Sequence, residues 1–175
     1  GVFVTARPTD YPLGRRVRFH QNVATSGRAP SRRFTRKETR PASVEEAEAL
    51  GLSAGTMVHV VEGVSMVDGQ PVAVFGSVFP ALRFPGLLAA LEGQSSVTAA
   101  LAACGLADYV RAETRLTARR APAVLALALQ IDEGAPVLHS VAVNVDAAGI
   151  AVEFGTTWFA GDRVTLTVAP DLTAG

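Results

Sequence analysis

The chain uses one local plan twice, a helix followed by two β-strands joined by a tight turn, and this plan restricts the fold to one built around an antiparallel sheet. In the first unit Ser43 and Glu46 form a capping box that begins a helix, and Asp68-Gly69 is typical of a hairpin turn. In the second unit Pro122 stands where a helix begins. The expected elements are helices over 43–50 and 121–129 and strands over 58–67, 72–79, 137–145 and 151–159. The repeat is explained either by internal duplication or by chance, since a helix followed by a hairpin is a common arrangement.

Composition limits the chain to one domain with an ordinary core. The 175 residues are 49% hydrophobic and 18% charged, which suits one packed domain. The 16 basic residues balance 16 acidic ones, so the chain lacks the overall positive charge of a nucleic-acid binder. The single Cys104 excludes an internal disulfide and a multi-cysteine metal site. With no apolar run long enough for a membrane span and no signal peptide, we expect a soluble, cytoplasmic protein with no membrane partner.

The first residues indicate a fragment. Gly1–Val4 reads as the end of a strand, without an initiator methionine and without an earlier strand to pair with. Residues 5–13, with two prolines, are typical of a linker to a domain that preceded them.

Residues 11–22 hold the densest polar chemistry of the chain. Arg15, Arg16 and Arg18 lie there beside an aromatic side chain and two amides. Such a cluster contacts nucleic acid, holds a small anion or forms a solvated hinge. Strand alternation favours Arg16 and Arg18 together on one face.

Between the two units we expect helices over 84–91 and 96–103 and then a strand over 109–117. Alternation in this strand predicts that Arg111, Glu113 and Arg115 share one face with Tyr109. That face either binds a ligand or is the ordinary solvated side of an antiparallel sheet. The pair Arg119-Arg120 is expected on the surface where the next helix begins.

Two further strands carry candidate binding groups. In the last hairpin Glu153 and Thr157 share a face with Gly155 and Phe159, and the carboxylate suits recognition of a hydroxyl or an amine, or is a surface residue. On the strand over 72–79, Ser77 shares a face with two phenylalanines, so its hydroxyl needs a partner from the backbone or a ligand.

Catalytic and metal-binding patterns are not found. His20, His59 and His139 are scattered, and the sequence holds no HExxH, no CxxC and no phosphate-binding glycine loop. We therefore predict no enzyme, no catalytic residues, no metal and no cofactor.

Several short motifs occur in an order and spacing that resembles a known family. They are Gly1–Val4, the run Arg16-Val-Arg18-Phe19-His-Gln21-Asn22, Val67-Asp-Gly69-Gln-Pro71, Thr117–Ala121, and Val152-Glu153 through to Gly161-Asp162-Arg163. Together they are similar to the effector-binding UTRA domain of HutC-type GntR transcriptional regulators, over about residues 11 to 168. The Arg-x-Arg-Phe-x-Gln-Asn run is most similar to the branch that regulates phosphonate utilisation.

The resemblance implies an α/β (α+β) fold of the chorismate lyase type, with a central antiparallel sheet flanked by helices. It implies that residues 1–10 are the end of a wing strand and a linker, 11–170 the effector-binding and dimerisation domain, and 171–175 a tail. The function it implies is that of a homodimeric regulator, a repressor, in which a small anionic effector changes DNA binding by a missing N-terminal winged helix-turn-helix domain. DNA would be bound by that domain and not by this fragment.

The same resemblance, with the arginine positions above, implies the ligand-binding residues. They are Arg16, Arg18, His20, Ser77, Arg111, Arg115, Glu153 and Thr157. Arginines would neutralise the anion while Ser77 and His20 complete the site and Glu153 orients a hydroxyl or amine. The family often has basic residues where this chain has Glu62–Ser65 and a tyrosine where it has Phe159, so a small phosphonate or phosphate-like anion is favoured over a sugar phosphate. A lyase-like enzyme and a dimerisation module without an effector are the alternatives.

Overall fold

The computed structural model describes residues 7–15, 23–24 and 26–169. The elements are β1 (Thr9–Leu13), β2 (Pro30–Pro41), α2 (Val44–Leu50), β3 (Met57–Val67), β4 (Gln70–Pro80), α3 (Leu87–Ala90), α4 (Val97–Ala103), β5 (Val110–Arg120), α5 (Ala123–Leu129), β6 (Pro136–Val145), β7 (Ala151–Ala160) and β8 (Val164–Val168). No helix in these ranges is long and apolar enough to cross a membrane.

Six strands form one antiparallel sheet in the order β2-β3-β4-β7-β6-β5, and β1 and β8 form a separate parallel pair. Both predicted hairpins are present as β3-β4 and β6-β7, and they meet in the middle of the sheet where β4 pairs with β7. The predicted α+β class with a central antiparallel sheet is confirmed.

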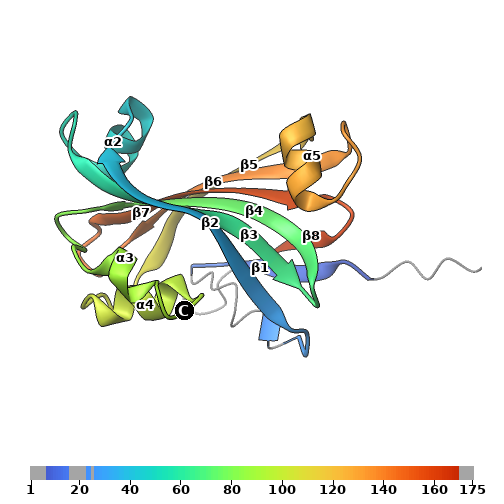
Figure 1. Ribbon diagram of the computed structural model, residues 1–175, viewed down its shortest axis with the longest axis horizontal. Helices are drawn as coiled ribbons and strands as arrows, with labels where there is room; N and C mark the ends of the chain where they lie inside the picture. The colour runs from blue at the N-terminus through green and yellow to red at the C-terminus, as the bar shows by residue number, and fades with distance from the viewer. Residues whose placement is uncertain (1–6, 16–22, 25, 170–175) are drawn as a thin grey trace, which may run out of the picture.

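The helices cover the two faces of the sheet differently (Figure 1). On one face, here called the α2/α5 face, α2 packs on Val58, Val60 and Phe154 near one end, and α5 packs on Val137 and Ala160 near the other. The opposite face, here called the α3/α4 face, is covered by α3 and α4 at one end and by the β1-β8 pair at the other.

Local sequence chemistry explains the boundaries of the first unit. The Ser43 hydroxyl accepts the Glu46 backbone N–H at 3.2 Å, and the Glu46 carboxylate accepts the Ser43 N–H at 2.8 Å. Asp68 and Gly69 both have positive φ, at 52° and 78°, as a type I′ hairpin turn requires.

The structure differs from the sequence-based expectations at the edges. Strand β2 was not expected, because its charged sequence lacks the alternation of a half-buried strand, yet it pairs along β3 as an edge strand. Residues 9–13, expected as linker, form β1 and bury Tyr11. Arg119 and Arg120 continue β5 instead of beginning a helix, and α3 is shorter than the expected 84–91.

The apolar packing on the α3/α4 face is divided into two clusters. Under α3 and α4, buried Val61, Phe75 and Phe79 pack with the helices. Under β1 and β8, buried Tyr11 and Phe159 pack with neighbouring aliphatic side chains. The sheet between the two clusters carries polar residues, and this polar gap is where a site can lie.

Candidate functional site

The polar gap is built from β4, β5, β6 and β7. Pairing places Asn144 opposite both Glu153 and Arg111, and Ser77 opposite Gly155, so these side chains share the α3/α4 face. Ser77 and Asn144 are buried, at 8% and 7% exposure, although both are polar. Buried polar groups need hydrogen-bond partners, and here they find them in one another.

A continuous chain of hydrogen bonds runs through the gap. Glu153 accepts at Oε1 from the Ser77 hydroxyl at 2.7 Å and at Oε2 from the Asn144 amide at 2.6 Å. The Asn144 Oδ1 atom accepts from Arg111 Nε at 2.8 Å, and Arg111 Nη1 donates to the Thr114 hydroxyl at 3.0 Å. We call Ser77, Arg111, Thr114, Asn144 and Glu153 the Glu153 cluster.

Tyr11 and Arg32 interact electrostatically with members of the Glu153 cluster. Burial raises the pKa of the Tyr11 hydroxyl, and the nearby positive charges of Arg32 and Arg111 oppose that rise. Desolvation lowers the pKa of Arg32, whereas Tyr11 and Glu153 act to raise it. The Arg32 guanidinium lies over the Phe75 ring, 4.7 Å from its centroid, which fixes its direction. Arg32, Arg111 and Glu153 are therefore all close enough to affect the Tyr11 hydroxyl.

In the middle of the polar gap the sheet carries only small side chains, around Gly155. A Cβ atom added at Gly155 would meet nothing closer than Glu153 Oε1 at 3.8 Å, which is an ordinary contact distance. Ser77 on one side of Gly155 and Ala142 on the other have short side chains. The side chains on this part of the sheet are therefore short, and the surface directly over Gly155 is not crowded.

Several predicted site residues come together here. The prediction that Ser77 shares a face with Phe75 and Phe79 is confirmed, as is the prediction that Glu153 and Thr157 share one. Glu153 supplies the partner that the Ser77 hydroxyl was expected to need. Arg16, Arg18 and His20 lie outside the described residues.

The prediction that Arg111 and Arg115 share a face is wrong. The pairing of β5 with β6 shifts between Arg111 and Glu113, so Arg111 lies opposite Asn144 and Arg115 opposite Val141. The extra residue of this bulge reverses the alternation. Arg115 consequently lies on the α2/α5 face, where its side chain is 74% exposed and its Nε is 3.1 Å from Glu113 Oε1.

Sequence reasoning missed four members of the site. Thr114 was missed because the bulge that brings it to the face of Arg111 was not predicted. Asn144 had a signal, because an amide in the mainly aliphatic end 141–145 of this strand needs a buried partner. Arg32 lies on β2, which was not predicted as a strand, and Tyr11 lies in the segment expected as a linker.

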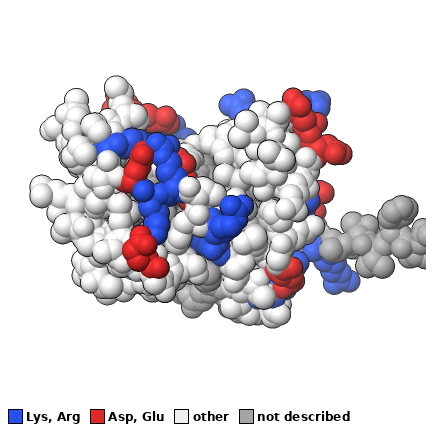
Figure 2. Space-filling model, viewed as in Figure 1, with Lys and Arg blue, Asp and Glu red and all other residues white. Residues whose placement is uncertain are grey.

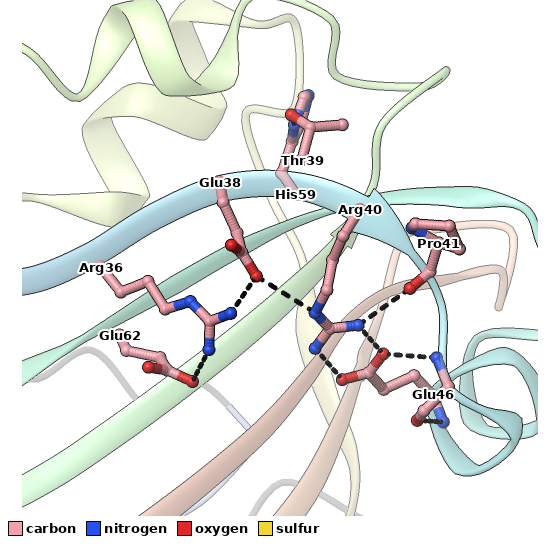
Figure 3. Close-up of polar contacts among 9 residues, drawn as sticks. Arg36, Glu38, Thr39, Arg40, Pro41, Glu46, His59 and Glu62 are labelled. Atoms are coloured by element: carbon pink, nitrogen blue, oxygen red, sulfur yellow. Dashed lines mark hydrogen bonds and ion pairs between the residues drawn. The ribbon is translucent and has the colours of Figure 1, made fainter.

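A second charged group lies on the α2/α5 face, along β2 (Figures 2 and 3). We call Arg36, Glu38, Arg40, Glu46 and Glu62 the Arg40 network. Arg40 donates two hydrogen bonds of 2.7 Å to the Glu46 carboxylate. The Oε1 atom of Glu38 is 2.5 Å from Arg36 Nη2 and 3.3 Å from Arg40 Nε. The adjoining cavity measures about 80 Å³. With three carboxylates for two guanidiniums, this network suits anchoring of α2 to the sheet better than anion binding.

The histidines have structural surroundings. His59 contacts the Thr39 hydroxyl at 2.8 Å and the Phe84 carbonyl oxygen at 3.0 Å, and the His139 ring stacks on Trp158 with centroids 3.8 Å apart. Burial, and then Arg119, lower the pKa of His139. Within residues 7–15, 23–24 and 26–169, His, Cys, Asp and Glu form no group of three or more that could hold a metal ion.

Known proteins resemble this chain along most of its length. A regulator of Rhizobium meliloti described as an uncharacterized HTH-type transcriptional regulator is 39% identical, over 90% of this chain and 65% of its own length. A protein of Escherichia coli named as the probable transcriptional regulator PhnF is 30% identical, over 96% of this chain and 70% of its own length. The chain thus spans about two thirds of these two relatives.

Solved structures share the fold. The effector domain of PhnF from Mycobacterium smegmatis superposes with a TM-score of 0.81 at 24% identity, covering 93% of this chain and 99% of that one. Residues 25–165 match the UTRA domain family. The chain therefore belongs to the UTRA domain family, whose relatives named here are transcriptional regulators.

Proposed function

We propose that this chain is the effector-sensing part of a bacterial, cytoplasmic transcriptional regulator and that it binds a small anionic metabolite in the polar gap. The observation that carries this proposal is the Glu153 cluster, a hydrogen-bonded polar group set between two apolar clusters on one face of the sheet. A few convergent polar groups beside apolar surface are typical of small-molecule sites.

Arg111 is the anion-binding group best supported by geometry. A guanidinium has five N–H donors, and the hydrogen bonds to Asn144 and Thr114 hold it in place without using all of them. The remaining donors can bind two oxygens of a phosphonate, phosphate or carboxylate side by side. Arg32 adds a second positive charge from across the gap, and Ser77 and Thr157 add hydroxyl groups.

A phosphonate or phosphate ester is the favoured chemistry. Two relatives carry the name PhnF, and the one from Mycolicibacterium smegmatis is described as a repressor. Phe159 packs against Tyr11 with ring centroids 5.5 Å apart inside an apolar cluster, which suits a small ligand better than a sugar. Glu62 does not bear on this choice, because it pairs with Gly76 and belongs to the Arg40 network on the opposite face.

The N-terminal strand offers a route from effector to DNA-binding domain. Burial raises the pKa of Tyr11 on β1 and the nearby Arg32 and Arg111 oppose the rise, and the Arg111 backbone N–H donates to the Arg15 carbonyl at 2.6 Å. A ligand that shifts the β5 backbone at Arg111 would act on Arg15, two residues after β1. It changes DNA binding only if it binds one arrangement of that segment better than the other.

Calorimetric titration tests the site. Methylphosphonate, inorganic phosphate and glycerol phosphate would be titrated into the chain and into Arg111→Ala, with Arg115→Ala as the matched control on the opposite face. We expect binding that Arg111→Ala weakens by at least about tenfold, since one charge-assisted pair is lost, and that Arg115→Ala leaves unchanged. Equal affinity in all three proteins contradicts the assigned site, and absence of binding favours a dimerisation module without an effector.

We also propose that the protein is a homodimer and that α5 lies in the interface. Every residue of α5 is apolar, yet Val124 and Leu127 are 83% and 82% exposed. A helix that is apolar all round is normally covered on all sides. Analytical ultracentrifugation should show a dimer that Leu127→Glu weakens, whereas Leu82→Glu, also at an exposed leucine, does not. A monomeric wild-type chain contradicts this proposal.

A further inference from the structure

Glu153 is an unexpected group for a site that binds only an anion. Its carboxylate lies in the middle of the polar gap, and the two hydrogen bonds that described residues give it come from neutral donors, Ser77 and Asn144. A carboxylate has acceptor positions for about four hydrogen bonds, so capacity remains at both oxygens. Its negative charge would repel a ligand that carried only negative charge.

We infer that the effector is a zwitterion, with an amino group that binds Glu153 and an anionic group that binds Arg111. This inference rests on the proposed function and specifies the class of ligand. The amine would donate charge-assisted hydrogen bonds to the open acceptor positions of Glu153. A hydroxyl could occupy the same positions, but it would leave the half-buried Glu153 carboxylate without a direct ion pair, since the described residues that donate hydrogen bonds to it are the neutral Ser77 and Asn144.

Asn144 sets the spacing of the two charges. One amide group links them, because its oxygen accepts from Arg111 at 2.8 Å and its nitrogen donates to Glu153 at 2.6 Å. The guanidinium and the carboxylate are therefore held on either side of a single amide. A ligand that bridges them needs its amine and its anion joined by a short alkyl spacer.

The small floor residue supports this position for the amine. The space over Gly155 adjoins Glu153 Oε1, which is the nearest atom to an added Cβ at 3.8 Å. A compact ammonium group fits such a space next to the carboxylate. Gly155→Val would fill it and should weaken the amine-bearing ligand.

Matched ligand pairs test the inference by calorimetry. The pairs are 2-aminoethylphosphonate with ethylphosphonate and 3-aminopropylphosphonate with propylphosphonate, titrated into wild type, Glu153→Gln and the control Glu113→Gln on the exposed part of β5. In wild type and in the control, at least one amine-bearing member should bind about tenfold or more tightly than its partner. In Glu153→Gln this preference should fall below about threefold, while the alkylphosphonates keep or gain affinity as a repulsive charge is removed.

N-acetylated 2-aminoethylphosphonate gives a readout that needs no variant. It keeps an N–H donor but loses the positive charge, so it should bind wild type no better than ethylphosphonate. Equal binding of both members of each pair to wild type would overturn the inference, as would a preference that survives in Glu153→Gln. Failure of these phosphonates, of inorganic phosphate and of glycerol phosphate to bind would instead count against the proposed function itself.

Discussion

Asn144→Leu tests the structural basis of the polar gap directly, because Asn144 connects its two oppositely charged members. Leucine has a similar size and keeps the β6 backbone hydrogen bonds. It removes the hydrogen bond that Arg111 donates at 2.8 Å and the one that Glu153 accepts at 2.6 Å. Arg111 and Glu153 therefore each lose one hydrogen-bond partner. Asn144 is only 7% exposed, so the lost bonds lie in a largely buried position.

The expected loss follows from the two bonds. A hydrogen bond to a charged group contributes about 1.5–3 kcal/mol, so two contribute about 3–6 kcal/mol. Arg111 and Glu153 are only half-buried and water can replace part of what they lose, so the lower end applies. Burial of the leucine side chain offsets about 1 kcal/mol more. The free energy of unfolding should fall by about 2 kcal/mol, which lowers Tm by about 4–8 °C for a chain of this size.

Urea unfolding of wild type, Asn144→Leu, Glu153→Gln and the double variant measures both the loss and its cause. If the Asn144 amide acts through Glu153, the double variant should be more stable than the sum of the single losses predicts, by about 1 kcal/mol. A loss below about 0.5 kcal/mol in Asn144→Leu, or strict additivity in the cycle, would refute the view that Asn144 holds these charges together.

Three further predictions concern stability elsewhere. Arg163 donates to the carbonyl oxygens of Pro71, Leu129 and Gln130 at 2.6–2.8 Å, so Arg163→Ala should lower the free energy of unfolding by about 3 kcal/mol in urea, and Arg163→Lys should recover only part. A Cβ at Gly63 would lie 2.5 Å from the Arg33 carbonyl oxygen and 2.9 Å from the Phe75 ring, so Gly63→Ala should lose about 3 kcal/mol while Gly155→Ala loses less than about 1 kcal/mol. The hydrogen bond from Arg40 holds the pKa of Glu46 below its ordinary value of 4.5, so the carboxylate stabilises the fold above that pH and the effect disappears as pH falls through the lowered pKa. The difference in Tm between wild type and Glu46→Gln should accordingly be full at neutral pH and shrink in acid; a difference that grows in acid would contradict this sign.

Local chemistry explains why the two helix-and-hairpin units could be predicted. Capping at Ser43 and positive φ at Gly69 are requirements of single turns, and they can be read without knowing what lies across the sheet. The shared face of Glu153 and Thr157 was predictable for the same reason, because β7 alternates without interruption there.

The remaining features depend on partners distant in sequence. Strand β2 is stabilised by pairing with β3 and by ion pairs to Glu62 on β3 and Glu46 on α2, and neither kind of contact can be read from the residues of β2 alone. The bulge between Arg111 and Glu113 has no sequence signal of its own, since Ala112 is compatible with regular alternation. One extra residue on an edge strand was sufficient to move Arg115 to the other face.

The structure of residues 9–13 bears on how the proposed effector would act on the chain. A flexible linker would transmit little, because a ligand changes an equilibrium only through contacts that differ between its states. Residues 9–13 instead form a strand that pairs with β8, and Arg28 joins Thr9 to Asp68 in the β3-β4 turn. Tyr11 of the same strand lies among the charges of the polar gap. A ligand bound among those charges, as proposed above, would therefore act on a strand that β8 and Arg28 join to the rest of the fold.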